Sequence, residues 1–202
     1  MSFVGSNILA GAAGSQGGAG YKIERSLRFN SADSAYLNRT PLSEGNRTKW
    51  TWSGWIKRNK LGTFQRIFAV SGGPNNDDNW FAIALNTSNQ ITLGGYSTFF
   101  RTTVAQYRDC SAWMHLVVTI DLDATASMKI FVNGVQQTLS GSSDPSTTGI
   151  NNNLTHYLGV EGASAYCDLQ LAEVHFIDGQ ALAATDFGEF DDNNVWQPKE
   201  VT

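Results

Sequence analysis

The chain is 202 residues long, and only 16% of these residues are charged, against 41% that are hydrophobic. The net charge of −4, without any run of Lys or Arg, excludes the basic surface of a typical nucleic-acid-binding protein, and no stretch approaches the ~18 apolar residues of a membrane-spanning helix. So little charge also argues against a coiled coil or a disordered chain, whereas 20 glycines and 11% aromatic residues predict an all-β protein with many turns.

Residues 1–24 differ in composition from the rest, and we predict that they form an extended, Gly-rich N-terminal arm. Glycine, alanine and serine dominate residues 1–20, which carry no charged side chain, so the segment cannot form a core of its own. It is either a tail in solvent or an arm that docks on another subunit. Four apolar residues favour docking, because a solvent spacer does not need them: Phe3, Val4, Ile8 and Leu9.

The start of the chain lacks the basic segment and the unbroken apolar run of a signal peptide. We therefore expect synthesis in the cytoplasm without export. In that compartment Cys110 and Cys167 are expected to be free, buried thiols, although a disulfide between them is the alternative.

Short segments with the alternation of β-strands follow at intervals of about 8–12 residues. The clearest local signal is Asn133-Gly134, which predicts a type I′ hairpin. We predict that residues 25–187 form an antiparallel two-sheet β-sandwich of jelly-roll type, followed by a C-terminal tail at 188–202. The expected strands cover residues 27–29, 35–37, 50–57, 64–70, 80–85, 90–93, 113–120, 128–132, 135–139, 157–160 and 169–177.

Alternation along the longer strands assigns one side to the core and the other to a candidate interaction face. The predicted core side carries Leu116, Val118, Ile120, Met128, Ile130, Val132, Ala172, Val174 and Phe176. The opposite side carries six candidate ligand-binding or interface residues: Trp55, Trp113, His115, Phe131, Glu173 and His175. Such a face suits a sugar or a second subunit, and cover by the chain's own loops is the third alternative.

Candidate metal ligands are sparse. Asp77 and Asp78 lie in an Asn/Asp-rich run that offers the oxygen ligands calcium prefers, but the same residues also favour turns for backbone reasons alone. The histidines lie far apart at 115, 156 and 175, so we expect no zinc site.

Four motifs occur in an order that resembles the laminin-G-like, concanavalin A-like lectin/glucanase superfamily, over about residues 25–187. They are Trp52–Lys57, Trp113–Thr119, Lys129–Gly134 and Leu171–Leu182. The resemblance implies a concanavalin A-like jelly roll.

Glucanases of this superfamily place two or three carboxylates on one face of a single strand. Here Glu173 has no carboxylate two residues away, Asp168 falls on the opposite face, and Asp121 and Asp123 lie in a predicted turn. We therefore expect no catalytic residues and no enzymatic activity.

The segments Phe176–Leu182 and Val195–Lys199 are similar to lectin-fold proteins of tailed bacteriophages, many of them marine. This resemblance implies a non-enzymatic virion structural protein, either a capsid decoration or a tail or fibre appendage, made in the host cytoplasm and located in the virion. Other virion proteins would be its partners, the arm would dock on neighbouring subunits, and a homo-oligomer is expected. The alternative is a carbohydrate-binding module that recognises a polysaccharide of the host surface or the environment.

Overall fold

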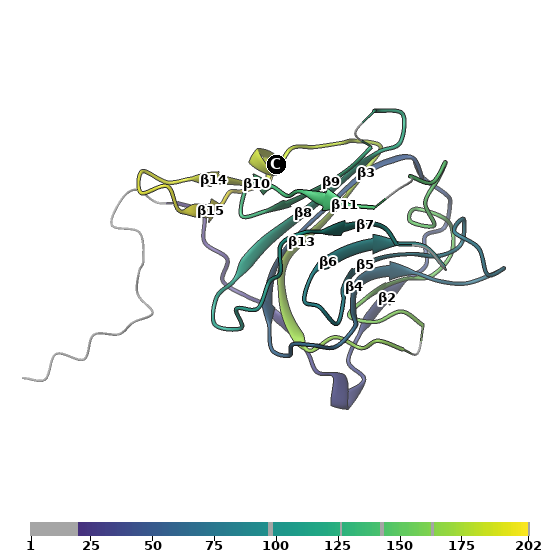
Figure 1. The fold of residues 1–202 in the computed structure, drawn as a ribbon, viewed down its shortest axis with the longest axis horizontal. Coiled ribbons are helices and arrows are strands. Elements are labelled where there is room, and N and C mark those ends of the chain that lie inside the picture. The colour runs from purple at the N-terminus through teal and green to yellow at the C-terminus, as the bar shows by residue number, and fades with distance from the viewer. Residues whose placement is uncertain (1–19, 97–98, 126, 142–143, 163, 202) are drawn as a thin grey trace, which may run out of the picture.

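The computed structural model describes residues 20–96, 99–125, 127–141, 144–162 and 164–201. Two large antiparallel sheets pack face to face, as the two layers in Figure 1 show. The sandwich predicted from the sequence is therefore confirmed. The arm residues Phe3, Val4, Ile8 and Leu9 lie outside the described residues.

One layer is a six-stranded sheet. Its spatial order is β1 (Leu27–Phe29), β13 (Leu169–Asp178), β3 (Lys49–Arg58), β8 (Met114–Asp121), β9 (Met128–Val132) and β10 (Val135–Gln136).

The other layer is a seven-stranded sheet. Its order is β11 (Leu139–Ser140), β7 (Phe99–Thr103), β6 (Ile91–Gly94), β5 (Phe81–Leu85), β4 (Gln65–Val70), β12 (His156–Leu158) and β2 (Leu37–Arg39). Strand β7 was not predicted, because its sequence lacks a clear apolar alternation.

Three short elements complete the described fold: the 3-10 turns η1 (Ser31–Asp33) and η2 (Ala184–Asp186) and a hairpin of β14 (Gly188–Phe190) and β15 (Trp196–Pro198). The segment predicted as a C-terminal tail thus contains a hairpin. No helix among the described residues is long and apolar enough to cross a membrane.

The inner sides of both sheets form the main core, with Trp50, Trp52 and Ile56 of β3 fully buried. The indole of Trp52 lies over Gly54, where a Cβ atom would come within 2.7 Å of the ring, so this close approach needs glycine. The predicted hairpin is confirmed, because Asn133 and Gly134 both have positive φ, at 48° and 77°.

A β-bulge changes which side chains of β13 face the core. The register with β3 shifts between Ala172 and His175, and Glu173 takes the left-handed conformation with φ 46°. Leu171 therefore lies opposite the inward-facing Ile56, and Ala172 lies opposite the outward-facing Trp55. The assignment of Ala172 to the core side was wrong, since an extra residue in a strand reverses the alternation that follows.

Both cysteines are free in the structure. Cys167 is buried, and this burial raises the pKa of its thiol. Cys110 is only half-buried. The prediction of free thiols is therefore confirmed for both residues, and the prediction of burial only for Cys167.

Candidate functional site

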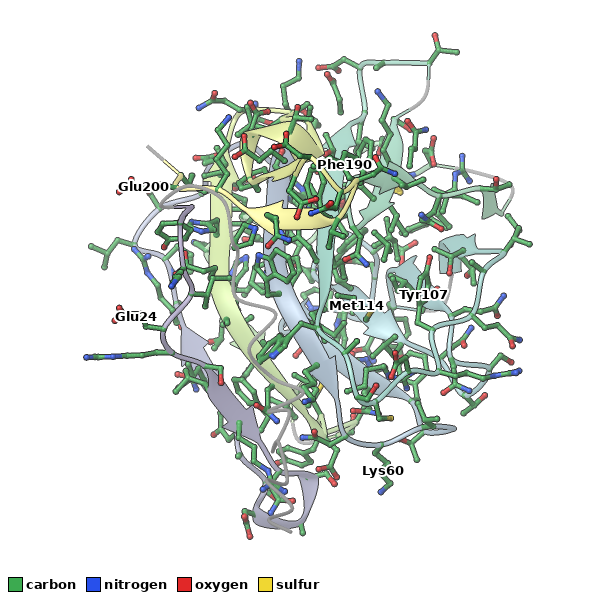
Figure 2. The ribbon with its side chains drawn as sticks, turned by 90° about the vertical axis from the view of Figure 1, so that its left-hand side faces the viewer. Glu24, Lys60, Tyr107, Met114, Phe190 and Glu200 are labelled. Carbon is green, nitrogen blue, oxygen red and sulfur yellow. The ribbon has the colours of Figure 1, made fainter. Side chains whose placement is uncertain are left out.

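The outer side of the six-stranded sheet, where the sequence placed an interaction face, lies under the chain's own C-terminal segment. We call residues 180–201 the C-terminal cover. Thr51 of β3 donates a hydrogen bond to the carbonyl of Gln180 at 2.8 Å, and Thr119 of β8 donates to that of Leu182 at 2.7 Å. Figure 2 looks onto this face and shows the yellow hairpin, which carries Phe190, in front of the sheet.

A small second core joins the cover to the sheet. Its buried members are Val117, Ala184, Phe187 and Trp196, and half-buried residues that include Trp55 and Phe131 pack against it. The ring of Trp196 fits over Gly134 and Gly188, where Cβ atoms would lie 2.3 and 2.5 Å from it. The type I′ turn therefore also makes room for the cover.

His115 is the polar centre of this second core and is only 1% exposed. The indole N–H of Trp196 donates to its Nδ1 at 3.0 Å, and its Nε2 lies 2.8 Å from Oγ of Ser53. Because an indole nitrogen can only donate, Nδ1 is unprotonated and Nε2–H is the donor to Ser53. Burial, and then the charge of His175, lower the pKa of His115 to about 4, so the ring is neutral near pH 7.

Three of the six candidate residues thus pack beneath or against the cover, His115 buried and Trp55 and Phe131 half-buried. Trp55 stacks on His115 with ring centroids 4.9 Å apart, and Phe131 packs against the cover. Of the three alternatives left open by the sequence, the chain's own segment is the one that occupies this part of the face.

The remaining three candidates lie at its margins. Trp113 directly precedes β8 and is half-buried. Glu173 and His175 are 3.3 Å apart, and a hydrogen bond to Glu173 raises the pKa of Tyr21. The space that this pair shares with Tyr21 and the cover measures about 10 Å³, which is too small for a sugar ring.

The carboxylates named for catalysis are separated and engaged elsewhere. Glu173 pairs with His175, Asp168 accepts a hydrogen bond from Ser31 at 2.6 Å, and Asp121 lies 3.1 Å from Lys49.

The candidate calcium ligands hold loops together. Asp77 accepts a hydrogen bond from the backbone N–H of Tyr96 at 2.7 Å, and Asp78 lies 3.7 Å from Arg47. Within the described part of the chain, no group of three or more His, Cys, Asp or Glu side chains gathers as a metal site would require. The turn interpretation therefore accounts for both residues.

The seven-stranded sheet carries a different set of aromatic side chains on its outer side. Tyr36, Tyr157 and Tyr166, which we call the tyrosine cluster, come from the residue before β2, from β12 and from the loop before β13. The ring centroid of Tyr36 lies 6.2 Å from that of Tyr157 and 6.4 Å from that of Tyr166. Tyr36 is 44% exposed, so the cluster presents aromatic surface to solvent.

An ion pair connects β4 to the loop that carries Tyr166. Arg66 of β4 contacts the carboxylate of Glu161, and its guanidinium also lies 4.9 Å above the ring of Phe64. Burial raises the pKa of Glu161, and the charge of Arg66 opposes this shift. The pair therefore supplies fixed polar groups beside an apolar ring surface.

The floor beside the cluster consists of small side chains. Strand register places Tyr157 next to Ala69 and Ala82 in one outward row, and Arg66 next to Ala84 and Thr92 in another. All four of these small residues are buried, so larger side chains of the outer side cover them. Exposed aromatic rings with a few polar groups beside them are what a sugar-binding surface requires.

Sequence reasoning missed the tyrosine cluster. Tyr166 lies in a loop, where alternation assigns no face. Tyr36 was expected within a strand at 35–37 but directly precedes β2, and Tyr157 was used only to mark a strand. The one available signal was the separate occurrence of three tyrosines next to predicted strand ends, and nothing local brings them together.

The architecture and this surface define a lectin-like β-sandwich. Residues 29–186 match the family described as the concanavalin A-like lectin/glucanases superfamily, and the chain belongs to that family. A comparison with curated protein sequences finds no match.

Solved structures with the same fold are distant in sequence. Domain 4 of AbnA, an extracellular GH43 arabinanase of Geobacillus stearothermophilus solved with arabinotriose, is 20% identical with a TM-score of 0.52, over 70% of this chain and 66% of that one. The NanB sialidase of Streptococcus pneumoniae is 15% identical with a TM-score of 0.56, over 82% of this chain but only 28% of the sialidase. A heptameric SAP-like pentraxin of Limulus polyphemus is 15% identical with a TM-score of 0.50, over 73% and 71%. At these identities the likeness shows the fold alone.

Proposed function

We propose that this protein is a non-enzymatic carbohydrate-binding module whose ligand lies on the tyrosine cluster. The observation that carries the proposal is the convergence of three tyrosines from separate segments on the outer side of the seven-stranded sheet, which the C-terminal cover leaves free. The C-terminal cover closes the outer side of the six-stranded sheet, where the sequence predicted an interaction face. We therefore place the proposed binding surface on the seven-stranded sheet.

The chemistry of the surface fits a neutral or weakly polar glycan. Tyrosine rings stack on the apolar faces of pyranose rings, and their hydroxyls can both donate and accept hydrogen bonds. Arg66, which is half-buried and hydrogen-bonded through its backbone N–H to Ala165, the residue before Tyr166, adds a donor at the margin. The arabinanase domain supports this proposal, since it has a similar fold and was solved in complex with arabinotriose.

A glycan array followed by calorimetry on the strongest ligand tests the site. Replacing Tyr36 with alanine is expected to weaken binding about tenfold or more, which corresponds to about 1.4 kcal/mol, because a stacking ring is lost. Tyr96→Ala is the matched control, since Tyr96 is 46% exposed at another place on the surface.

Equal loss in both variants would contradict the assignment to the cluster. Loss with Trp113→Ala but not with Tyr36→Ala would instead place the ligand at the margin of the six-stranded sheet. Silence across a broad array would count against carbohydrate binding itself.

We also propose that the protein does not hydrolyse the polysaccharides that it binds. Incubation with the polysaccharides that bind is expected to release no reducing sugar, because the structure holds the named carboxylates in separate pairs. Release that disappears in a Glu173→Gln variant would show a glycosidase.

A virion is the setting we propose for this module, as a capsid decoration or a tail or fibre appendage. The support is the resemblance of Phe176–Leu182 and Val195–Lys199 to lectin-fold phage proteins. Both segments adjoin or form the C-terminal cover, which packs on the six-stranded sheet.

The arm provides the test of this setting. Deleting residues 1–20 is expected to abolish incorporation into particles while leaving the melting temperature of the sandwich unchanged, because the arm carries the docking residues. Incorporation is measured by the protein composition of purified particles. Full incorporation of the truncated protein would remove the arm from the proposal.

A further inference from the structure

A cavity of about 430 Å³ opens between the two sheets at the edge formed by β2, β12 and β13. The rings of Trp52 and Phe68 are stacked in its wall with centroids 6.3 Å apart, and Phe176 lies 5.7 Å from Phe68. Its volume falls within the ~300–1,000 Å³ typical of small-molecule pockets. The apolar lining includes Leu37, Trp52, Phe68, Leu158, Val174 and Phe176.

The shape of β13 leaves this edge open. Strand β1 pairs with Leu169–Leu171, so the later part of β13, which contributes Val174 and Phe176, extends beyond it. The bulge at Glu173 turns both of these side chains inward. A cavity with apolar walls is the result.

The polar side chains of Asn151, His156 and Asp178 at the mouth are already hydrogen-bonded within the protein. His156 accepts at Nε2 from the N–H of Asn151 at 2.8 Å and donates from Nδ1 to the carbonyl of Leu154 at 2.9 Å. Asp178 accepts from the side chain of Asn151 at 2.5 Å and from the N–H of Asn46 at 2.8 Å. The side chains of Asn38 and Tyr157 belong to the outward row and face away from the cavity.

Two polar groups of the lining are unused. Among the described residues, the indole N–H of Trp52 has no hydrogen-bond partner although the side chain is 0% exposed. Arg39 lies opposite His156 in the register of β2 with β12 and is exposed at the mouth of the cavity; within the described ranges its guanidinium makes no hydrogen bond or ion pair with the protein. Both groups can only donate, so a ligand that pairs with them must bring acceptors.

We infer that this cavity binds a small apolar carboxylic acid, with its alkyl or aryl body against the apolar wall that includes Phe68 and Phe176 and its carboxylate at Arg39. An ammonium ligand would meet the cation of Arg39 and would offer it no acceptor. A hydroxyl-rich sugar would lose hydration against aromatic and aliphatic walls. The inference concerns a different surface from the tyrosine cluster and does not depend on glycan binding.

Calorimetry with three ten-carbon probes at submicellar concentration tests the chemistry: decanoate, decanol and decylammonium. Decanoate is expected to bind at least tenfold more tightly than decylammonium, because only the acid pairs with Arg39. Arg39→Gln is expected to weaken decanoate at least tenfold and to leave decanol unchanged. Arg28→Gln, an exposed arginine on β1, is the matched control and is expected to change neither.

A second variant tests whether decanoate binds in this cavity. Leu37 is 48% exposed at the mouth, so Leu37→Trp is expected to block the cavity and abolish decanoate binding with little change in melting temperature. Tyr36→Ala is expected to retain decanoate binding, which separates this inference from the glycan proposal. Equal affinity for decylammonium, no binding of decanoate, or undiminished binding in both Leu37→Trp and Arg39→Gln would overturn it.

Discussion

Replacing Trp196 with alanine is expected to lower the free energy of unfolding by about 3–5 kcal/mol. The side chain is 7% exposed and packs between the cover and the sheet, and its N–H holds Nδ1 of His115. The substitution leaves a large void and an unpaired buried acceptor, so the cover loses its attachment. Chemical denaturation monitored by circular dichroism measures the change.

Two further variants separate packing from hydrogen bonding. Val195→Ala changes the neighbouring residue, which is 53% exposed, and is expected to alter stability by less than about 0.5 kcal/mol. Trp196→Phe keeps most of the buried ring but removes the donor, with an expected loss of about 1–3 kcal/mol. A Trp196→Ala protein as stable as Val195→Ala would mean that the cover does not rest on the sheet.

The stability of the protein is expected to fall by roughly 3 kcal/mol between about pH 6.5 and pH 4 through His115 alone. The folded protein holds the pKa of this ring at about 4, against an ordinary value of 6.5. Over this interval the unfolded chain binds a proton that the folded protein does not, so acid favours unfolding. The contribution is fully present above pH 6.5 and is lost as the pH falls toward 4.

The free energy of unfolding of wild type and of His115→Gln, measured across this pH range, isolates the effect. The variant lacks the titrating ring, so its stability is expected to depend less steeply on pH, whatever its stability at pH 7. His156, whose pKa burial also lowers, is present in both proteins and cancels from the difference. Parallel curves for the two proteins would show that folding does not lower the pKa of His115.

Much of the fold could be predicted because its signals are local. Alternation placed Leu116, Val118 and Ile120 of β8 and Met128 and Ile130 of β9 in the core, where all five are buried. The turn at Asn133-Gly134 depends on two adjacent residues that tolerate positive φ. Both kinds of signal lie within a few residues along the chain, so no tertiary contact is needed to recognise them.

The candidate site was harder to predict because its contacts are distant in sequence. His115 and Trp196 are separated by 81 positions, and the residue pattern of β8 is the same whether its outer side meets solvent, a sugar or the cover. The tyrosine cluster likewise joins two loop residues to one strand residue. Alternation identifies two sides of a strand, but not what lies against the second side.

An all-β chain, a paired-sheet core and a tight Asn-Gly hairpin follow from the amino-acid sequence alone, because composition and side-chain alternation act at short range. The bulge at Glu173, with Ala172 facing outward, and the C-terminal cover, which closes one aromatic face, arise from the tertiary structure. So do the tyrosine cluster on the outer side of the other sheet and the cavity beside β13. These features depend on which distant segments pack together, and packing is settled by the shape of the whole fold.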